Sequence, residues 1–71
     1  MTTYAVIYER TENNYAAYVP DLPGCVATGR TRQEVERRIR AAIQMHLDGM
    51  REDGVAPPIP TSTAGSVETK A

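Results

Sequence analysis

The sequence has few of the residues with which small proteins cross-link themselves. Its 71 residues include one cysteine, Cys25, and one histidine, His46. A disulfide within the chain is therefore excluded, and so is a structural zinc site, because such a site needs four ligands. A chain of this length buries only about 60% of the surface that its unfolded form exposes. We therefore expect self-association, as a dimer or a tetramer, or binding to another protein to supply further stability.

An excess of positive charge and a long apolar run are also missing. Eight Lys and Arg residues against nine Asp and Glu residues give a net charge of -1. Without a basic field, we expect no direct binding to DNA or RNA. No apolar segment approaches the ~20 residues of a membrane span, and residues 1–4 lack the charged and then apolar pattern of a signal peptide. The expected location is the cytoplasm, with no membrane contact.

Three short apolar runs separated by turn residues predict a β-sheet. Residues 4–8 (YAVIY) are rich in β-branched and aromatic side chains, and residues 15–19 (YAAYV) follow a polar loop that ends in two asparagines. Residues 25–28 (CVAT) form the third run. Because consecutive strands at this separation pair antiparallel, we expect a three-stranded meander within residues 4–28.

A proline-rich corner, PDLPGC, separates the second and third predicted strands. Pro20 and Pro23 fix the backbone angle φ at two positions, and Gly24 is free to take a positive φ. Cys25 follows at the start of an apolar run, where a small buried thiol is the expected role. This pattern is typical of a structural turn.

The next segment predicts one amphipathic helix over residues 32–53. Thr31 and Glu34 have the spacing of a capping box, in which the threonine hydroxyl accepts from the backbone of Glu34 and the carboxylate reaches back. Apolar residues then follow at intervals of four and three, at positions 35, 39, 43, 47 and 50. Gly54 is the expected end of the helix.

The C-terminal part of the chain predicts little regular structure. Residues 55–60 contain three prolines and indicate an extended connector. Only Val67 could anchor a strand in the polar segment that follows, and we expect a short fourth strand at about residues 66–69. The whole chain, residues 1–71, is then a single α+β domain of order β-β-β-α-β, with the helix packed on one face of the sheet.

One helix covers only one face of such a sheet, yet the first two strands are apolar on both sides. We therefore expect the uncovered face to be rich in tyrosine and to bind a partner. The tip of the proline-rich corner is expected to project and to take part. The candidate partner-binding residues are Tyr4, Tyr8, Tyr15, Tyr18, Asp21 and Leu22.

Three hypotheses of catalysis, metal binding or nucleic-acid binding are alternatives to these structural interpretations. Cys25 and His46 could form a nucleophilic dyad, but no third orienting residue is evident and His46 lies within the apolar stripe of the helix. Asp21 could hold a divalent metal, but the other carboxylates are mostly on the helix. Tyr15 and Tyr18 could stack on bases, but the basic groove of such sites is missing. We favour packing, turn formation and protein contact, with no cofactor and no metal.

Residues 15–29 (YAAYVPDLPGCVATG) are followed by a capped helix segment, TRQEVERRIRAAIQMHLDGMREDG, and by the exit PPIP. In this order and spacing they resemble the HicB family of antitoxins of type II toxin-antitoxin systems. The resemblance covers roughly residues 4–60. It implies a partial ribonuclease H-like fold that lacks the catalytic carboxylates of that superfamily, and a protein that is not an enzyme.

The resemblance also implies a partner. HicB antitoxins bind HicA, a small basic protein that cleaves mRNA using a histidine, and cover its active site. Many members continue into a C-terminal DNA-binding domain, and this chain ends near the point where that domain starts, so we do not expect it to repress transcription alone. The alternatives are an orphan homo-oligomeric module that binds another protein or a small ligand, and a residual metal-dependent nuclease. A neighbouring gene for a small basic protein that contains histidine would favour the antitoxin.

Overall fold

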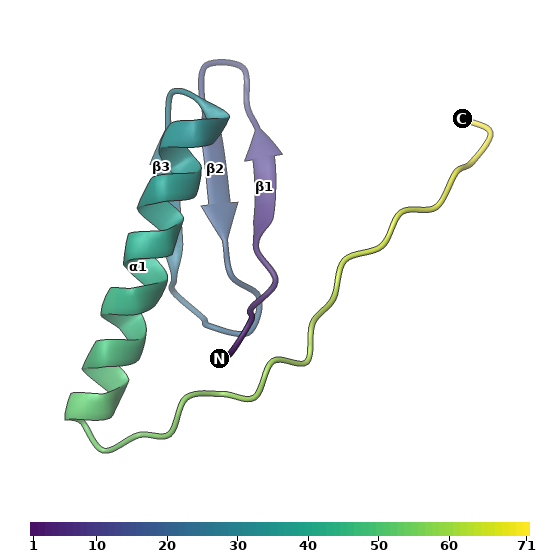
Figure 1. Cartoon of the computed structure of the whole chain (residues 1–71). Coiled ribbons are helices and arrows are strands. Elements are labelled where there is room, and N and C mark those ends of the chain that lie inside the picture. Colours follow the sequence, from purple (N-terminus) through teal and green to yellow (C-terminus); the bar gives the residue numbers. More distant parts are fainter.

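The computed structural model describes all 71 residues and consists of a three-stranded antiparallel sheet followed by one long helix (Figure 1). This order confirms the predicted α+β class. The elements are β1 (Ile7–Arg10), β2 (Tyr15–Tyr18), β3 (Val26–Gly29) and α1 (Arg32–Glu52). The strands lie in the order β1-β2-β3, so β1 and β3 are the two edges of the sheet.

The register of the strands decides which side chains share a face. Ala17 pairs with Tyr8 on one side and with Ala27 on the other, and all three pack against the core. Because side chains alternate along a strand, the neighbouring row of paired residues, Ile7, Tyr18 and Val26, lies on the opposite face. The helix lies across β3 and β2 and leaves β1 to one side.

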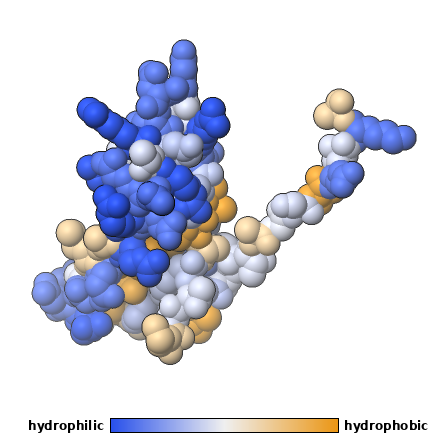
Figure 2. Space-filling view, turned by 45° about the horizontal axis from the view of Figure 1, so that its top comes forward, coloured by the Kyte–Doolittle hydropathy of each residue, from blue (hydrophilic) through white to orange (hydrophobic).

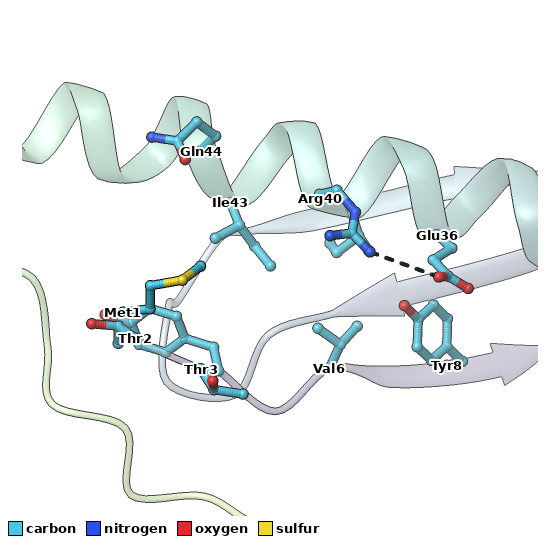
Figure 3. Close-up of a pocket in the computed structure, with 11 residues that line it drawn as sticks. Met1, Thr2, Thr3, Val6, Tyr8, Glu36, Arg40, Ile43 and Gln44 are labelled. Carbon is cyan, nitrogen blue, oxygen red and sulfur yellow. Dashed lines mark ion pairs between the residues drawn. The ribbon is translucent and has the colours of Figure 1, made fainter.

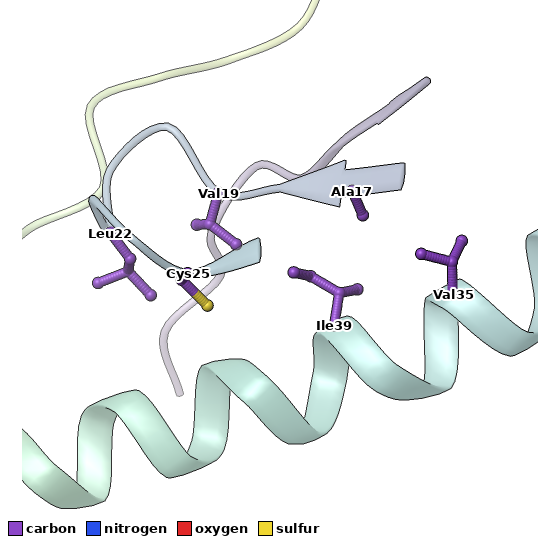
Figure 4. Packing of buried hydrophobic residues seen from close by; sticks show 6 residues of the cluster. All are labelled: Ala17, Val19, Leu22, Cys25, Val35 and Ile39. Carbon is purple, nitrogen blue, oxygen red and sulfur yellow. The ribbon is translucent and has the colours of Figure 1, made fainter. Parts of the chain in front are cut away.

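The core lies between the helix and the corner end of the sheet (Figure 4). The buried hydrophobic residues come from β2, the corner and two successive turns of the helix, and they are Ala17, Val19, Leu22, Cys25, Val35 and Ile39. Gly29 is also buried, and a Cβ there would lie 2.9 Å from the backbone nitrogen of Val35. Only a glycine permits so close an approach of strand to helix.

The helix begins and ends with local hydrogen bonds. The Thr31 hydroxyl accepts from the Glu34 backbone nitrogen at 3.0 Å. The Glu34 carboxylate accepts from the backbone nitrogen of Arg30 at 3.2 Å, one residue before the expected donor. At the other end, the Gly54 backbone nitrogen donates to Arg51 at 3.1 Å with a φ of 71°, and the helix ends at Glu52, one residue earlier than predicted.

The backbone of Gly24 has a φ of 85°, in the left-handed region. A Cβ at this position would meet no atom within 4 Å, so a substitution would strain the backbone without a steric clash. We expect Gly24→Ala to destabilise the protein by about 1 kcal/mol or more. Gly49→Ala is the matched control, because Gly49 lies within the helix and a Cβ there would also meet no atom within 4 Å. This substitution should stabilise the protein by about 0.5–1 kcal/mol. Urea denaturation measures both, and equal effects of the two substitutions would contradict the strain at Gly24.

The prediction of a fourth strand at about residues 66–69 is wrong for this structure. The chain from residue 55 onward has no regular secondary structure and runs away from the sheet (Figure 1). Val67 is 86% exposed, because the segment lies next to no other strand and carries no second large apolar side chain. The proline-containing residues 55–60 form the extended connector.

Candidate functional site

The face of the sheet opposite the helix carries a continuous apolar row. Ile7 pairs with Tyr18, and Tyr18 pairs with Val26, so the row crosses all three strands. Tyr18 is 39% exposed and Val26 is 64% exposed. We call Ile7, Tyr18 and Val26 the open-face row. No element of this chain covers it (Figure 1).

The placement of the tyrosines on the uncovered face is wrong for three of the four. Tyr4, Tyr8 and Tyr15 pack against the core, on the side of the sheet where the helix lies, and only Tyr18 belongs to the open-face row. The guanidinium of Arg32 lies 3.3 Å from the centroid of the Tyr8 ring, in a cation–π contact that ties β1 to the first turn of the helix. The three rings therefore lie on the core side of the sheet, and Tyr8 contacts the helix directly.

The placement of Leu22 at a projecting tip is also wrong. Leu22 is fully buried, at 0% exposure. Its backbone nitrogen donates to Val19 at 3.1 Å, and its carbonyl accepts from Cys25 at 3.0 Å. These bonds fold the corner back, so that the leucine points into the core and fills its end (Figure 4).

Asp21 binds the C-terminal part of the chain. Its Oδ2 accepts from the backbone nitrogens of Thr61 and Ser62, and its Oδ1 accepts from both hydroxyls, with all four distances at 3.0 Å. A neighbouring bond, from the Tyr4 hydroxyl to the Pro58 carbonyl at 2.6 Å, holds the connector beside it. We call the bonds of Asp21 to Thr61 and Ser62 the Asp21 clamp. The predicted alternatives for Asp21, a turn residue, a partner contact or a metal ligand, did not include the clamp.

The clamp lowers the pKa of the Asp21 carboxyl below its ordinary 3.8. The largest cause is the bond from the Ser62 backbone nitrogen, and the opposing effect of desolvation is outweighed by that bond together with those from Thr61 and the two hydroxyls. A carboxylate with a lowered pKa stabilises the folded state above its ordinary pKa, and this contribution is lost as the pH falls through the lowered value. The Asp21 carboxyl is therefore ionised at neutral pH, and only acidification below its ordinary pKa weakens the clamp by protonating it.

We expect Asp21→Asn to release the C-terminal segment at neutral pH. The amide keeps one acceptor oxygen where the carboxylate has two, and it has no charge to strengthen the bonds. Hydrogen exchange of the Thr61 and Ser62 amides should rise to the rate of Thr63, which lies just beyond the clamp. Asp53→Asn, at the exposed end of the helix, is the control. If the Thr61 and Ser62 amides stayed protected from hydrogen exchange in Asp21→Asn, the role of the carboxylate would be contradicted.

The remaining candidate groups are not arranged as a catalytic site. Cys25 is buried among apolar side chains, and burial raises the pKa of its thiol, which disfavours the thiolate form of a nucleophile. His46 is half-buried on the helix. No three His, Cys, Asp or Glu side chains converge as metal ligands. No helix is long and apolar enough to cross a membrane.

A groove runs between the start of β1 and the helix (Figure 3). Its volume is about 440 Å³. Val6 and Tyr8 line it from the strand side, Ile39 and Ile43 line it from the helix, and the ion pair of Glu36 with Arg40 (3.9 Å) lies at its rim. The groove exists because the helix lies over β2 and β3 and leaves β1 uncovered.

Comparison with known proteins identifies a family to which the sequence belongs. The sequence model of the HicB-like antitoxin of bacterial toxin-antitoxin systems matches residues 4–71. The chain belongs to the HicB-like antitoxin family. The family is part of toxin-antitoxin systems, which implies a toxin partner and makes the uncovered surfaces of this HicB-like chain the candidates for contact.

Relatives of this HicB-like chain are found in bacteria, archaea and a phage. A UPF0150 protein of Helicobacter pylori is 40% identical over 50 residues, which are 70% of this chain and 69% of that protein. A UPF0150 protein of Archaeoglobus fulgidus is 33% identical over 54 residues, which are 72% of this chain and 78% of that protein. An uncharacterized 14.9 kDa protein of Haemophilus phage HP1 is 38% identical over 50 residues, but these make up only 38% of its length.

A solved structure has the same fold as the HicB-like chain. The crystal structure of TTHA0281 from Thermus thermophilus superposes with a TM-score of 0.68 and is 36% identical in sequence. The match covers 75% of this chain and 68% of that one.

Two sets of candidate residues in this HicB-like chain were not among the sequence-based predictions. Ile7 and Val26 belong to the open-face row, where the register of the strands aligns them with Tyr18. A single sequence does not reveal this register when both faces of the strands are apolar. Thr61 and Ser62 lie in a polar segment to which the sequence assigns no role, because their partner lies 40 and 41 residues away in the sequence.

Proposed function

We propose that this protein is an antitoxin that binds a HicA-like, mRNA-cleaving toxin and neutralises it by covering its active site, without catalysis of its own. Membership of the HicB-like antitoxin family supports a toxin as the partner. The HicA-like identity of that toxin follows from the resemblance of the proline-rich corner, the capped helix and the PPIP exit. Because such a toxin acts on mRNA, the two proteins would meet in the cytoplasm.

The open-face row is the observation that carries the proposal. An apolar row that crosses three strands and exposes Tyr18 and Val26 is a poor surface to leave in water, and an aromatic ring at its centre is typical of the core of a protein interface. Tyr18 is flanked by Ile7 and Val26, so a toxin surface that covers the tyrosine also covers the two aliphatic side chains. The net charge of -1 also favours encounter with a basic toxin.

The test is a titration of the antitoxin into a cleavage assay. A HicA-like protein is incubated with RNA, and cleavage should stop once the antitoxin is in molar excess. Binding is measured in parallel with a fluorescently labelled chain and should be micromolar or tighter. Full cleavage at excess antitoxin would overturn the proposal and favour the orphan binding module. Cleavage of RNA by this chain alone with magnesium would favour the residual nuclease.

A further inference from the structure

The C-terminal segment beyond the Asp21 clamp projects from the body of the molecule. Residues 63–71, which we call the arm, are all exposed, and the structure records no hydrogen bond to any of them. The radius of gyration is 13.8 Å, against about 11 Å for a compact chain of this length. Figure 2 shows the C-terminal end of the chain as a thin projection that stands away from the body.

The sequence of the arm has the alternating pattern of a β-strand, although the arm pairs with no strand of its own chain. Val67, Thr69 and Ala71 alternate with Ser66, Glu68 and Lys70, so an extended backbone presents small and β-branched residues on one side and mostly charged residues on the other. An extended segment of this length spans about 30 Å, which exceeds the length of β1.

The outer edge of β1 is the strand edge that is open to such an arm. β1 exchanges backbone hydrogen bonds with β2 alone, so its other side presents unpaired groups. The opposite edge of the sheet is protected, because Arg38 donates to the Thr28 carbonyl of β3 at 3.0 Å and the helix lies beside that strand. The groove lined by Val6, Tyr8 and Ile43 adjoins the edge of β1 and offers an apolar surface for one side of an added strand.

We propose that two copies of this chain exchange their arms, so that the arm of each copy adds as a strand to the free edge of β1 in the other, with Val67 packed over the groove beside it. Addition of a strand to an edge satisfies backbone groups on both partners. The exchange is reciprocal and closes as a two-fold dimer. The Asp21 clamp fixes the point from which the arm leaves its own body. The proposal specifies the contacts of the predicted self-association and is independent of the toxin, since the open-face row stays uncovered in the dimer.

The test compares the full chain with a chain that ends at Ser62, which keeps the Asp21 clamp. Light scattering should give twice the single-chain mass for the full chain and the single-chain mass for the truncated one. Val67→Pro, which removes a backbone donor, should behave like the truncation, whereas Val67→Thr, which keeps the β-branched shape, should remain dimeric. A full chain of single-chain mass, or a truncated chain that is still dimeric, would overturn the proposal.

A second measurement distinguishes exchange between copies from pairing within one copy. In a mixture of isotopically labelled and unlabelled chains, nuclear Overhauser contacts between the Val67 methyls and the amides of β1 should be seen between chains. The same contacts within a single chain, or arm amides that exchange at the rate of an unfolded peptide, would overturn the proposal. Neutralisation of the toxin by the truncated chain is read separately, so failure of the exchange and failure of the antitoxin function give different results.

Discussion

Replacing Leu22 with alanine is expected to unfold much of the protein under conditions in which the native chain is folded. Leu22 has 0% exposure, is among the largest fully buried side chains, and lies at the end of the core that the corner closes. Truncation of a buried leucine to alanine costs about 2–5 kcal/mol. A domain of this size seldom has more than about 3–5 kcal/mol of stability, so little would remain.

Urea denaturation followed by circular dichroism measures this effect. Ile59→Ala is the control, because Ile59 is a large aliphatic residue that is 83% exposed, and its loss should change the free energy of unfolding by less than about 0.5 kcal/mol. If Leu22→Ala and Ile59→Ala had the same denaturation midpoint, the corner would not be part of the core.

The elements of the fold could be predicted from local patterns in the sequence. The helix has a capping threonine, a stripe of apolar residues at intervals of three and four, and a glycine with positive φ just after its end. The strands have β-branched and aromatic runs separated by turn residues. Each of these signals acts over a few residues, and each element therefore lies within a few residues of its predicted position.

The side of the sheet that the helix covers could not be predicted in the same way. The run Tyr4–Tyr8 has tyrosine and valine on one side and alanine and isoleucine on the other, and both sides are apolar enough to be buried. The sequence-based prediction has the tyrosine side facing the partner. In the structure the tyrosine side packs against the core on the helix side of the sheet, and the open-face row faces the solvent.

The proline-rich corner shows a similar limit. Two prolines and a glycine are typical of a turn at the surface, and the composition says nothing about where the residue between them points. Pro20, Pro23 and Gly24 are indeed exposed, whereas Leu22 is buried. The direction of its side chain is set by the bonds of its backbone to Val19 and Cys25, which depend on the whole corner.

The two proposed associations, with a toxin and with a second copy, use separate surfaces. The open-face row lies on the face of the sheet, whereas the free edge of β1 and its groove lie beside the helix. A toxin on the first and a second copy on the other would not compete for the same atoms. The Asp21 clamp fixes the point from which the arm leaves its own body.

Placing a lysine on the open-face row is expected to abolish neutralisation of the toxin and to leave the fold intact. Tyr18 and Val26 are not part of the buried core, so Tyr18→Lys and Val26→Lys add a charge to a surface that is already exposed. A toxin that covered the row would bury this charge without a partner. Loss of a residue at the centre of an interface costs about 2 kcal/mol or more, which corresponds to a drop in affinity of about 30-fold or more.

Met45→Lys provides the matched control. Met45 is 73% exposed and lies on the helix, away from the sheet, so the same charge is added to a surface that the proposal leaves free. Val26→Thr, which keeps the β-branched shape, should weaken binding less than Val26→Lys, because the interface would lose apolar contact without gaining a charge. The far-ultraviolet circular dichroism of all four variants should match that of the native chain. If both lysine variants on the row stopped RNA cleavage as well as the native chain and Met45→Lys did not, the toxin would bind the helix, and the uncovered sheet face would have to serve another purpose.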